Sequence, residues 1–126
     1  MAEAQNEELN ANGSGDELDY LKIAKFIIEK STDLFNRVTF NFNNVKEIAE
    51  NHSSHIFNFD DKCIIKIANR DDFVMEKTFE VEANFYTVNR KNSNIPILYR
   101  YDDSKLTVPF VYEIIELIKG RNLYEI

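Results

Sequence analysis

Lys66 is the residue whose setting most clearly indicates chemistry. It lies inside the apolar run 63–68 (CIIKIA), which is typical of a buried strand. A charged ammonium group in such a strand is costly unless an anionic group meets it. Alternation along the strand places Ile64 and Lys66 on the same face. An apolar side chain can then lie against a flat ring while the ammonium reaches phosphate oxygens. The alternative is a lysine on an edge or solvated face, which the apolar neighbours disfavour.

Glu82 is the candidate partner for Lys66. It falls in the segment that follows the strand, which predicts a helix from Phe73 to about Arg90. Taken alone, a helix glutamate is usually solvated. Glu82, however, stands between two apolar stripes, so we expect it to face the sheet more than Glu76 or Glu80 does. The stripes are Phe79, Ala83 and Tyr86 on one side and Val81, Phe85 and Val88 on the other.

The polar loop 51–55 (NHSSH) is a weaker signal. The backbone N–H groups and the hydroxyls of Ser53 and Ser54 could cradle phosphate oxygens, although such a segment is also an ordinary hairpin turn. The two histidines of the chain, His52 and His55, both lie here. No cysteine or second ligand cluster accompanies them, so we expect no metal site.

Composition bounds the class of protein. The chain has 126 residues and is 44% hydrophobic, enough for the core of one domain or part of one. Its net charge of −7 argues against binding nucleic acid or an anionic membrane surface. One cysteine, Cys63, cannot form an internal disulfide. With no membrane-spanning run and no signal-peptide pattern, we expect a soluble, cytoplasmic protein.

The order of predicted elements gives the fold class. Residues 1–15 are expected to be a disordered tail. Residues 16–38 are expected to hold an N-terminal helix that reaches about Arg37, capped by Ser14 or Asp16. Two strands separated by the polar loop, a tight turn at 60–62 and the strand 63–68 follow. The helix capped by Asp71 or Asp72 precedes two further strands at 97–101 and 107–117. This order predicts an α+β fold with a five-stranded antiparallel sheet and one inserted helix.

Four segments, in the correct order, resemble the N-terminal lobe of the aminoglycoside phosphotransferase family, which has a protein-kinase-like fold. Residues 56–68 resemble its second and third strands, ending at the nucleotide lysine, and Glu82-Ala83 resembles the helix glutamate that pairs with it. Residues 94–98 (NIPIL) resemble the loop and fourth strand, and 111–120 (VYEIIELIKG) the fifth strand and hinge. The resemblance spans roughly two thirds of the chain. It implies a kinase-like N-lobe over 39–119, with 120–126 opening a linker to an absent C-lobe.

The resemblance also implies a role for individual residues toward ATP. Lys66 would bind the α- and β-phosphates, and Glu82 would hold that lysine. The adenine would lie on apolar side chains and be read by the hinge backbone. These positions are Ile48, Ile56 and Ile64 along the adenine, Ile115 as gatekeeper, and the backbone carbonyl of Glu116 with the N–H of Ile118.

The chain departs from the protein-kinase pattern in two places. Aligning 48–56 with the glycine-rich loop puts Ala49, Asn51 and Ser54 where protein kinases have glycine. Small-molecule kinases of this type often use a serine loop, so Ser53 and Ser54 become candidate phosphate contacts. No His-x-Asp motif and no later metal-binding aspartate occur. We therefore expect no catalytic residue in this chain, and Mg²⁺ only with the C-lobe.

Two functions from different classes remain open. The first is the nucleotide-binding lobe of a small-molecule phosphotransferase, truncated and not catalytic alone. The second is a non-catalytic protein-interaction module derived from a kinase-like fold. In that case the exposed cleft face would bind a partner chain, or the N-terminal helix would cover it.

Overall fold

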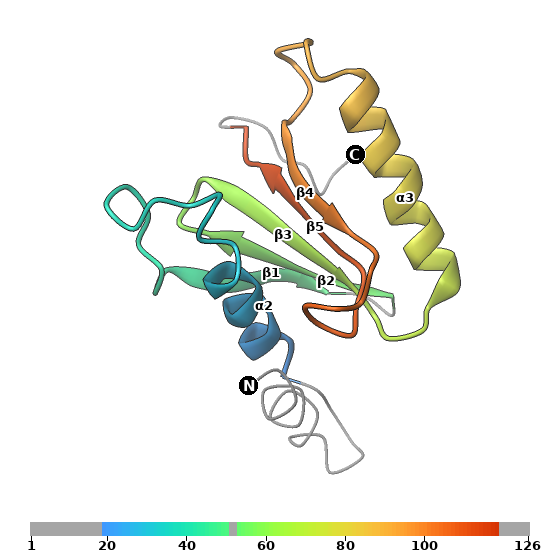
Figure 1. Cartoon of the computed structure of the whole chain (residues 1–126), viewed down its shortest axis with the longest axis horizontal. Coiled ribbons are helices and arrows are strands. Elements are labelled where there is room, and N and C mark those ends of the chain that lie inside the picture. Colours follow the sequence, from blue (N-terminus) through green and yellow to red (C-terminus); the bar gives the residue numbers. More distant parts are fainter. Residues whose placement is uncertain (1–18, 51–52, 119–126) are drawn as a thin grey trace.

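The computed structural model describes residues 19–50 and 53–118 (Figure 1). Five strands form one sheet in the order β1-β2-β3-β5-β4, and every neighbouring pair is antiparallel. This confirms the predicted α+β fold class. In chain order the elements are α2 (Tyr20–Glu29), β1 (Val45–Glu50), β2 (Ser54–Phe59), β3 (Cys63–Ala68), α3 (Phe73–Val88), β4 (Leu98–Asp102) and β5 (Tyr112–Glu116).

The two helices pack on the sheet from different sides, and the alternation of side chains along β3 decides what each one meets. Cys63, Ile65 and Ile67 belong to the main core, which includes the buried face of α2. Ala68 belongs instead to a small cluster with Phe79 of α3. Helix α2 therefore does not cover the face that carries Lys66. The idea that the N-terminal helix closes this face is wrong.

Helix α2 is shorter than expected. It begins after Asp19, whose carboxylate accepts the Lys22 N–H at 3.2 Å, and it ends at Glu29 rather than near Arg37. Buried Ser31 donates its hydroxyl to the Ile27 carbonyl at 2.7 Å, and the chain then turns. The turn brings Phe35 into the core. The expected caps Ser14 and Asp16, and the expected disordered tail, lie outside the described residues.

The turn between β2 and β3 sets the register of the central strands. Asp60 and Asp61 both have φ of 55°, and the Lys62 N–H bonds to the Phe59 carbonyl at 3.0 Å. Positive φ at both central residues is the type I′ geometry that suits a tight hairpin. The predicted tight turn is confirmed, and the resulting register places Ile56 directly opposite Lys66.

Helix α3 begins at Phe73, as predicted, and ends at Val88. Of the two proposed caps, Asp72 is the one used, because its carboxylate accepts the Met75 N–H at 3.0 Å. The last two strands are close to prediction, but the segment 107–111 is not part of β5. It contains Pro109, which has no N–H to give to a ladder. Val108 and Phe110 are buried in the core nonetheless.

Candidate functional site

Lys66 and Glu82 meet across the face of the sheet that α3 covers. The Lys66 Nζ lies 2.6 Å from Glu82 Oε1, with the lysine side chain 15% exposed and the glutamate 35% exposed. The ammonium also lies 5.2 Å from the centre of the Phe79 ring. The pairing that the strand and helix patterns predicted is confirmed. A mid-strand lysine is tolerated here because a carboxylate from the helix neutralises it.

A second ion pair, between Lys105 and Glu76, involves another glutamate of α3. Lys105 Nζ lies 2.9 Å from Glu76 Oε2, and the Glu76 side chain is only 15% exposed. Glu82 meets Lys66 on the sheet, as expected, and Glu80 is more exposed than Glu82, at 47%. The low exposure of Glu76, which pairs with a loop lysine, was not expected. The reason is tertiary, because Lys105 arrives from the loop between β4 and β5.

Glu113 is the functional-site residue that sequence reasoning missed. It lies opposite Lys66 on β5, its side chain is fully buried, and its Oε2 is 3.6 Å from Lys66 Nζ. Within the described part of the chain, neither of its oxygens has a hydrogen-bond partner as an ionised carboxylate. A signal was available, since a charge inside the run 111–115 (VYEII) poses the same question that Lys66 does.

The two glutamates beside Lys66 have pKa values displaced in opposite directions. Burial, followed by the hydrogen bond with Glu82, raises the pKa of Glu113 to about 9. Burial also opposes ionisation of Glu82, but hydrogen bonds with Glu113 and Lys66 outweigh it, so the Glu82 pKa is lowered. A neutral carboxyl next to an ionised one is the pattern expected where two acids compete for one cation.

Two of the three isoleucines proposed to line adenine, Ile56 and Ile64, share the face of Lys66. Ile56 is opposite Lys66, and Ile64 is opposite the proposed gatekeeper Ile115, so these three isoleucines surround the base of the lysine. Ile64 and Ile115 are buried, and Ile56 is partly exposed. Ile48 sits at the bulge between Glu47 and Ala49, outside the regular ladder. The structure brings Ile56, Ile64 and Ile115 together, and the contact of the proposed isoleucines with an adenine ring stays a prediction.

The remaining proposed contacts lie at the two ends of the sheet. Ser54 is the first residue of β2, opposite Ala68, and its side chain is buried on the same face as Ile56. Glu116 closes β5, where its N–H bonds to the Ile97 carbonyl at 2.8 Å. The next N–H, from Leu117, bonds to the Lys62 carbonyl at 3.0 Å. The phosphate role of Ser53 and Ser54 and the adenine role of Glu116 and Ile118 stay predictions.

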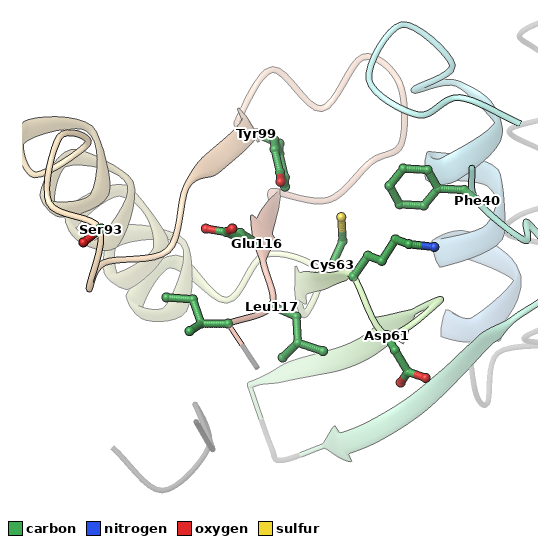
Figure 2. Close-up of a pocket in the computed structure, with 9 residues that line it drawn as sticks. Phe40, Asp61, Cys63, Ser93, Tyr99, Glu116 and Leu117 are labelled. Atoms are coloured by element: carbon green, nitrogen blue, oxygen red, sulfur yellow. The ribbon is translucent and has the colours of Figure 1, made fainter. Parts of the chain in front are cut away.

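Two hollows of the surface lie away from Lys66. One, of about 440 Å³, is bordered by the proposed hinge residues Glu116, Leu117 and Ile118. Figure 2 shows Cys63 of this hollow between Phe40 and Tyr99. The other, of about 490 Å³, lies between α3 and β4 around Lys105. Neither hollow is lined by Lys66 or Glu82. We therefore assign the candidate site from the charged groups around Lys66, which are Glu82 and Glu113 and which we call the lysine cluster.

A separate group of ionisable side chains joins His55 to two carboxylates of β1. Its Nδ1 is 2.6 Å from Glu47 Oε2 and 3.9 Å from Glu50 Oε2, and its ring stacks on Tyr20 at 3.9 Å. These three residues are close enough to offer ligand atoms to a metal ion. The contacts present are those of an imidazole paired with carboxylates, and we assign the cluster no metal. His52 lies outside the described residues.

Comparisons with known proteins give a fold-level likeness. No family model matches the chain, and no curated protein matches it. Among solved structures, it is similar to APH(2'')-IIa in a ternary complex with streptomycin and ATP, at 22% identity and a TM-score of 0.49. It is also similar to the ADP-bound aminoglycoside phosphotransferase APH(2'')-Ib, at 21% identity and a TM-score of 0.48.

These likenesses cover much of this chain but little of the other proteins. The matched part is 79% of this chain and 30% of APH(2'')-IIa, and 76% and 29% for APH(2'')-Ib. The chain therefore spans less than a third of the length of either protein. Separately, neither described helix is long and apolar enough to cross a membrane.

Proposed function

We propose that this chain is the ATP-binding N-lobe of a small-molecule phosphotransferase. The observation that carries the proposal is the Lys66–Glu82 ion pair, formed between the central strand of an antiparallel sheet and the helix inserted after it. Kinase-like folds use this pair to position nucleotide phosphates. The sequence resemblance to the aminoglycoside phosphotransferase family points to the same role.

The residues around the pair fit a nucleotide. Lys66 supplies a positive charge at one end of an apolar surface made by Ile56, Ile64 and Ile115. The phosphates would replace part of the contact that Glu82 makes with Lys66, and the adenine would lie on the isoleucines. The Glu116 carbonyl and the Ile118 N–H would read the adenine edge. Ser53 and Ser54 would approach the phosphates from the start of β2.

The lysine cluster does not fit a magnesium ion. Mg²⁺ in nucleotide sites is held by carboxylates that are free to coordinate it together with phosphate oxygens. Glu82 and Glu113 instead flank the Lys66 ammonium at 2.6 Å and 3.6 Å. We therefore propose no metal ion at these residues. Phosphoryl transfer also needs a group that orients the acceptor hydroxyl, so we propose that the C-lobe must supply both.

Calorimetry with Mg-ATP tests the proposal. We expect the chain to bind weakly, with a dissociation constant above the micromolar range, because the phosphate loop lacks glycine and a net charge of −7 repels a polyanion. Lys66→Ala is expected to abolish the binding. The matched control is Lys105→Ala, which breaks another lysine–glutamate pair of α3 and should leave the binding unchanged. Micromolar binding that survives Lys66→Ala would refute the proposal.

One observation favours the alternative, a protein-interaction module. Four apolar side chains form a stripe along α3 with no neighbour among the described residues to bury them: Val74 is 79% exposed, Val81 57%, Phe85 52% and Val88 79%. An exposed apolar stripe of this kind is typical of a protein-binding surface. Sedimentation of the purified chain tests it. Self-association that Phe85→Ser abolishes, together with no heat on adding Mg-ATP, would favour this function over nucleotide binding.

A further inference from the structure

Glu113 lies where three neighbouring elements face it with titratable groups. Lys66 lies opposite it on β3, and Tyr101 lies opposite it on β4. Glu82 reaches it from α3, and Tyr86 of the same helix feels its charge. The side chain is fully buried, so ionised oxygens there would have lost their hydration. Such a carboxylate is stable only with strong compensating contacts.

Those contacts are insufficient for an ionised Glu113. The single ammonium of Lys66 is already 2.6 Å from Glu82, and Glu113 is left at 3.6 Å. Tyr86 and Tyr101 are neutral and offer no positive charge to Glu113. Burial is the main cause that raises the pKa of each tyrosine to about 12. One cation between two carboxylates leaves one negative charge uncompensated. A proton on Glu113 removes that charge and turns the carboxyl into a donor.

We propose that Glu113 holds a proton that it donates to Glu82, and that this proton sets the affinity of Lys66 for a nucleotide polyphosphate. The part about affinity rests on the proposed function, whereas the part about the proton does not. With Glu113 neutral, the cluster of Lys66, Glu82 and Glu113 has no net charge. Loss of the proton to solvent leaves it at −1, directly behind the ammonium that must attract phosphate. The chain then binds nucleotide less well.

The raised pKa of Glu113, about 9, gives the pH window of the effect. Below it the proton is present and Lys66 is shared with one carboxylate only. Above it Lys66 is held between two carboxylates. One additional negative charge within several ångströms of the phosphates is expected to weaken binding by roughly tenfold or more.

A carboxyl titration of the ligand-free protein tests the proton by itself. Carbon-13 NMR of glutamate side-chain carboxyls is expected to show one group that is protonated at pH 7 and titrates near pH 9. The signal should be absent from Glu113→Gln. Titration of Glu113 below pH 6 would overturn the proposal. Because this experiment uses the wild-type chain, it decides the matter even if Glu113→Gln does not fold.

Mg-ATP binding measured from pH 7 to pH 9.5 tests the coupling. The wild-type chain should lose roughly three- to fourfold in affinity across this range, because about three quarters of Glu113 is ionised at pH 9.5, and Glu113→Gln should lose much less. Any change in the protonation of the nucleotide over this pH range affects its binding to both proteins equally, so it does not alter the difference between them. Glu76→Gln, which alters another ion-paired glutamate of α3, should keep the wild-type pH dependence. Equal slopes in wild type and Glu113→Gln would overturn the coupling.

The two experiments separate the failure of this inference from that of the proposed function. Absence of nucleotide binding at every pH overturns the proposed function and the coupling with it. The NMR titration then still shows whether Glu113 holds the proton. Conversely, nucleotide binding that depends on Lys66 but not on Glu113 leaves the proposed function intact and overturns this inference.

Discussion

Lys66 and Glu82 join the central strand of the sheet to α3 through an ion pair of 2.6 Å. The apolar contact beneath this helix is small, with Phe79 and Ala83 as its only buried residues. The pair therefore contributes to holding α3 on the sheet as well as presenting a cation to a ligand. Removing the Lys66 ammonium should destabilise α3 more than it destabilises the main core, which packs on α2.

Replacing Lys66 with methionine is expected to lower the free energy of unfolding by about 1–2 kcal/mol. The change leaves Glu82 and Glu113 facing each other without a cation, but Glu82 is partly solvated, which limits the cost. Urea unfolding gives the magnitude. Hydrogen exchange should show faster exchange in α3 than in α2, and equal acceleration in both helices would contradict this view of how α3 is held.

The stability of the fold should decrease as pH rises from about 4.5 to about 9. Glu113 titrates at an ordinary 4.5 when unfolded but at about 9 when folded, so the folded state binds the proton more tightly within this window. The contribution is complete below the lower value and is lost as pH rises through the window, by at most about 1.4 kcal/mol per pH unit. Glu113→Gln should flatten the slope measured by urea unfolding at several pH values. A slope unchanged by this variant would show that another group is responsible.

Two of the three phenylalanines of α3, Phe79 and Phe85, should differ sharply in their effect on stability. Phe79 is 1% exposed and contacts Lys66 as well as the small cluster, whereas Phe85 is 52% exposed. Phe79→Ala is expected to cost about 3–5 kcal/mol and Phe85→Ala less than about 1 kcal/mol. Thermal unfolding of both variants measures the difference. A large loss for Phe85→Ala would mean that the stripe is buried in solution, for instance against another copy of the chain.

Glycine should be tolerated at only one of the two turn positions between β2 and β3. Asp60 and Asp61 share the left-handed backbone that glycine adopts without strain. The Asp60 carboxylate, however, accepts hydrogen bonds from the Asn41 N–H, the Asn44 amide and Lys62, whereas the exposed Asp61 carboxylate accepts one, from the Asn58 amide. We expect Asp61→Gly to change stability by no more than about 0.5 kcal/mol, and Asp60→Gly to be clearly destabilising. Chemical denaturation of the two variants side by side gives the answer, and a tolerated Asp60→Gly would show that those bonds contribute little.

Local sequence determined the elements and one long-range pair. The run 63–68 marked β3, Asp71 or Asp72 marked the start of α3, and the turn signal at 60–62 marked the hairpin, because each signal depends on neighbouring residues. The pairing of Lys66 with Glu82 was also predictable. A charge in a buried strand demands a partner, and the next helix offered one.

Only the tertiary structure decided which groups surround that pair. The burial of Glu113 depends on β5 lying between β3 and β4, a strand order that no local pattern specifies. The low exposure of Glu76 depends on its ion pair with Lys105. The early end of α2 depends on the turn that brings Phe35 into the core. Sequence periodicity shows that a side chain points toward a sheet. Which charges it then meets, and whether it keeps its proton, depends on elements that are distant in the chain and are brought together only by folding.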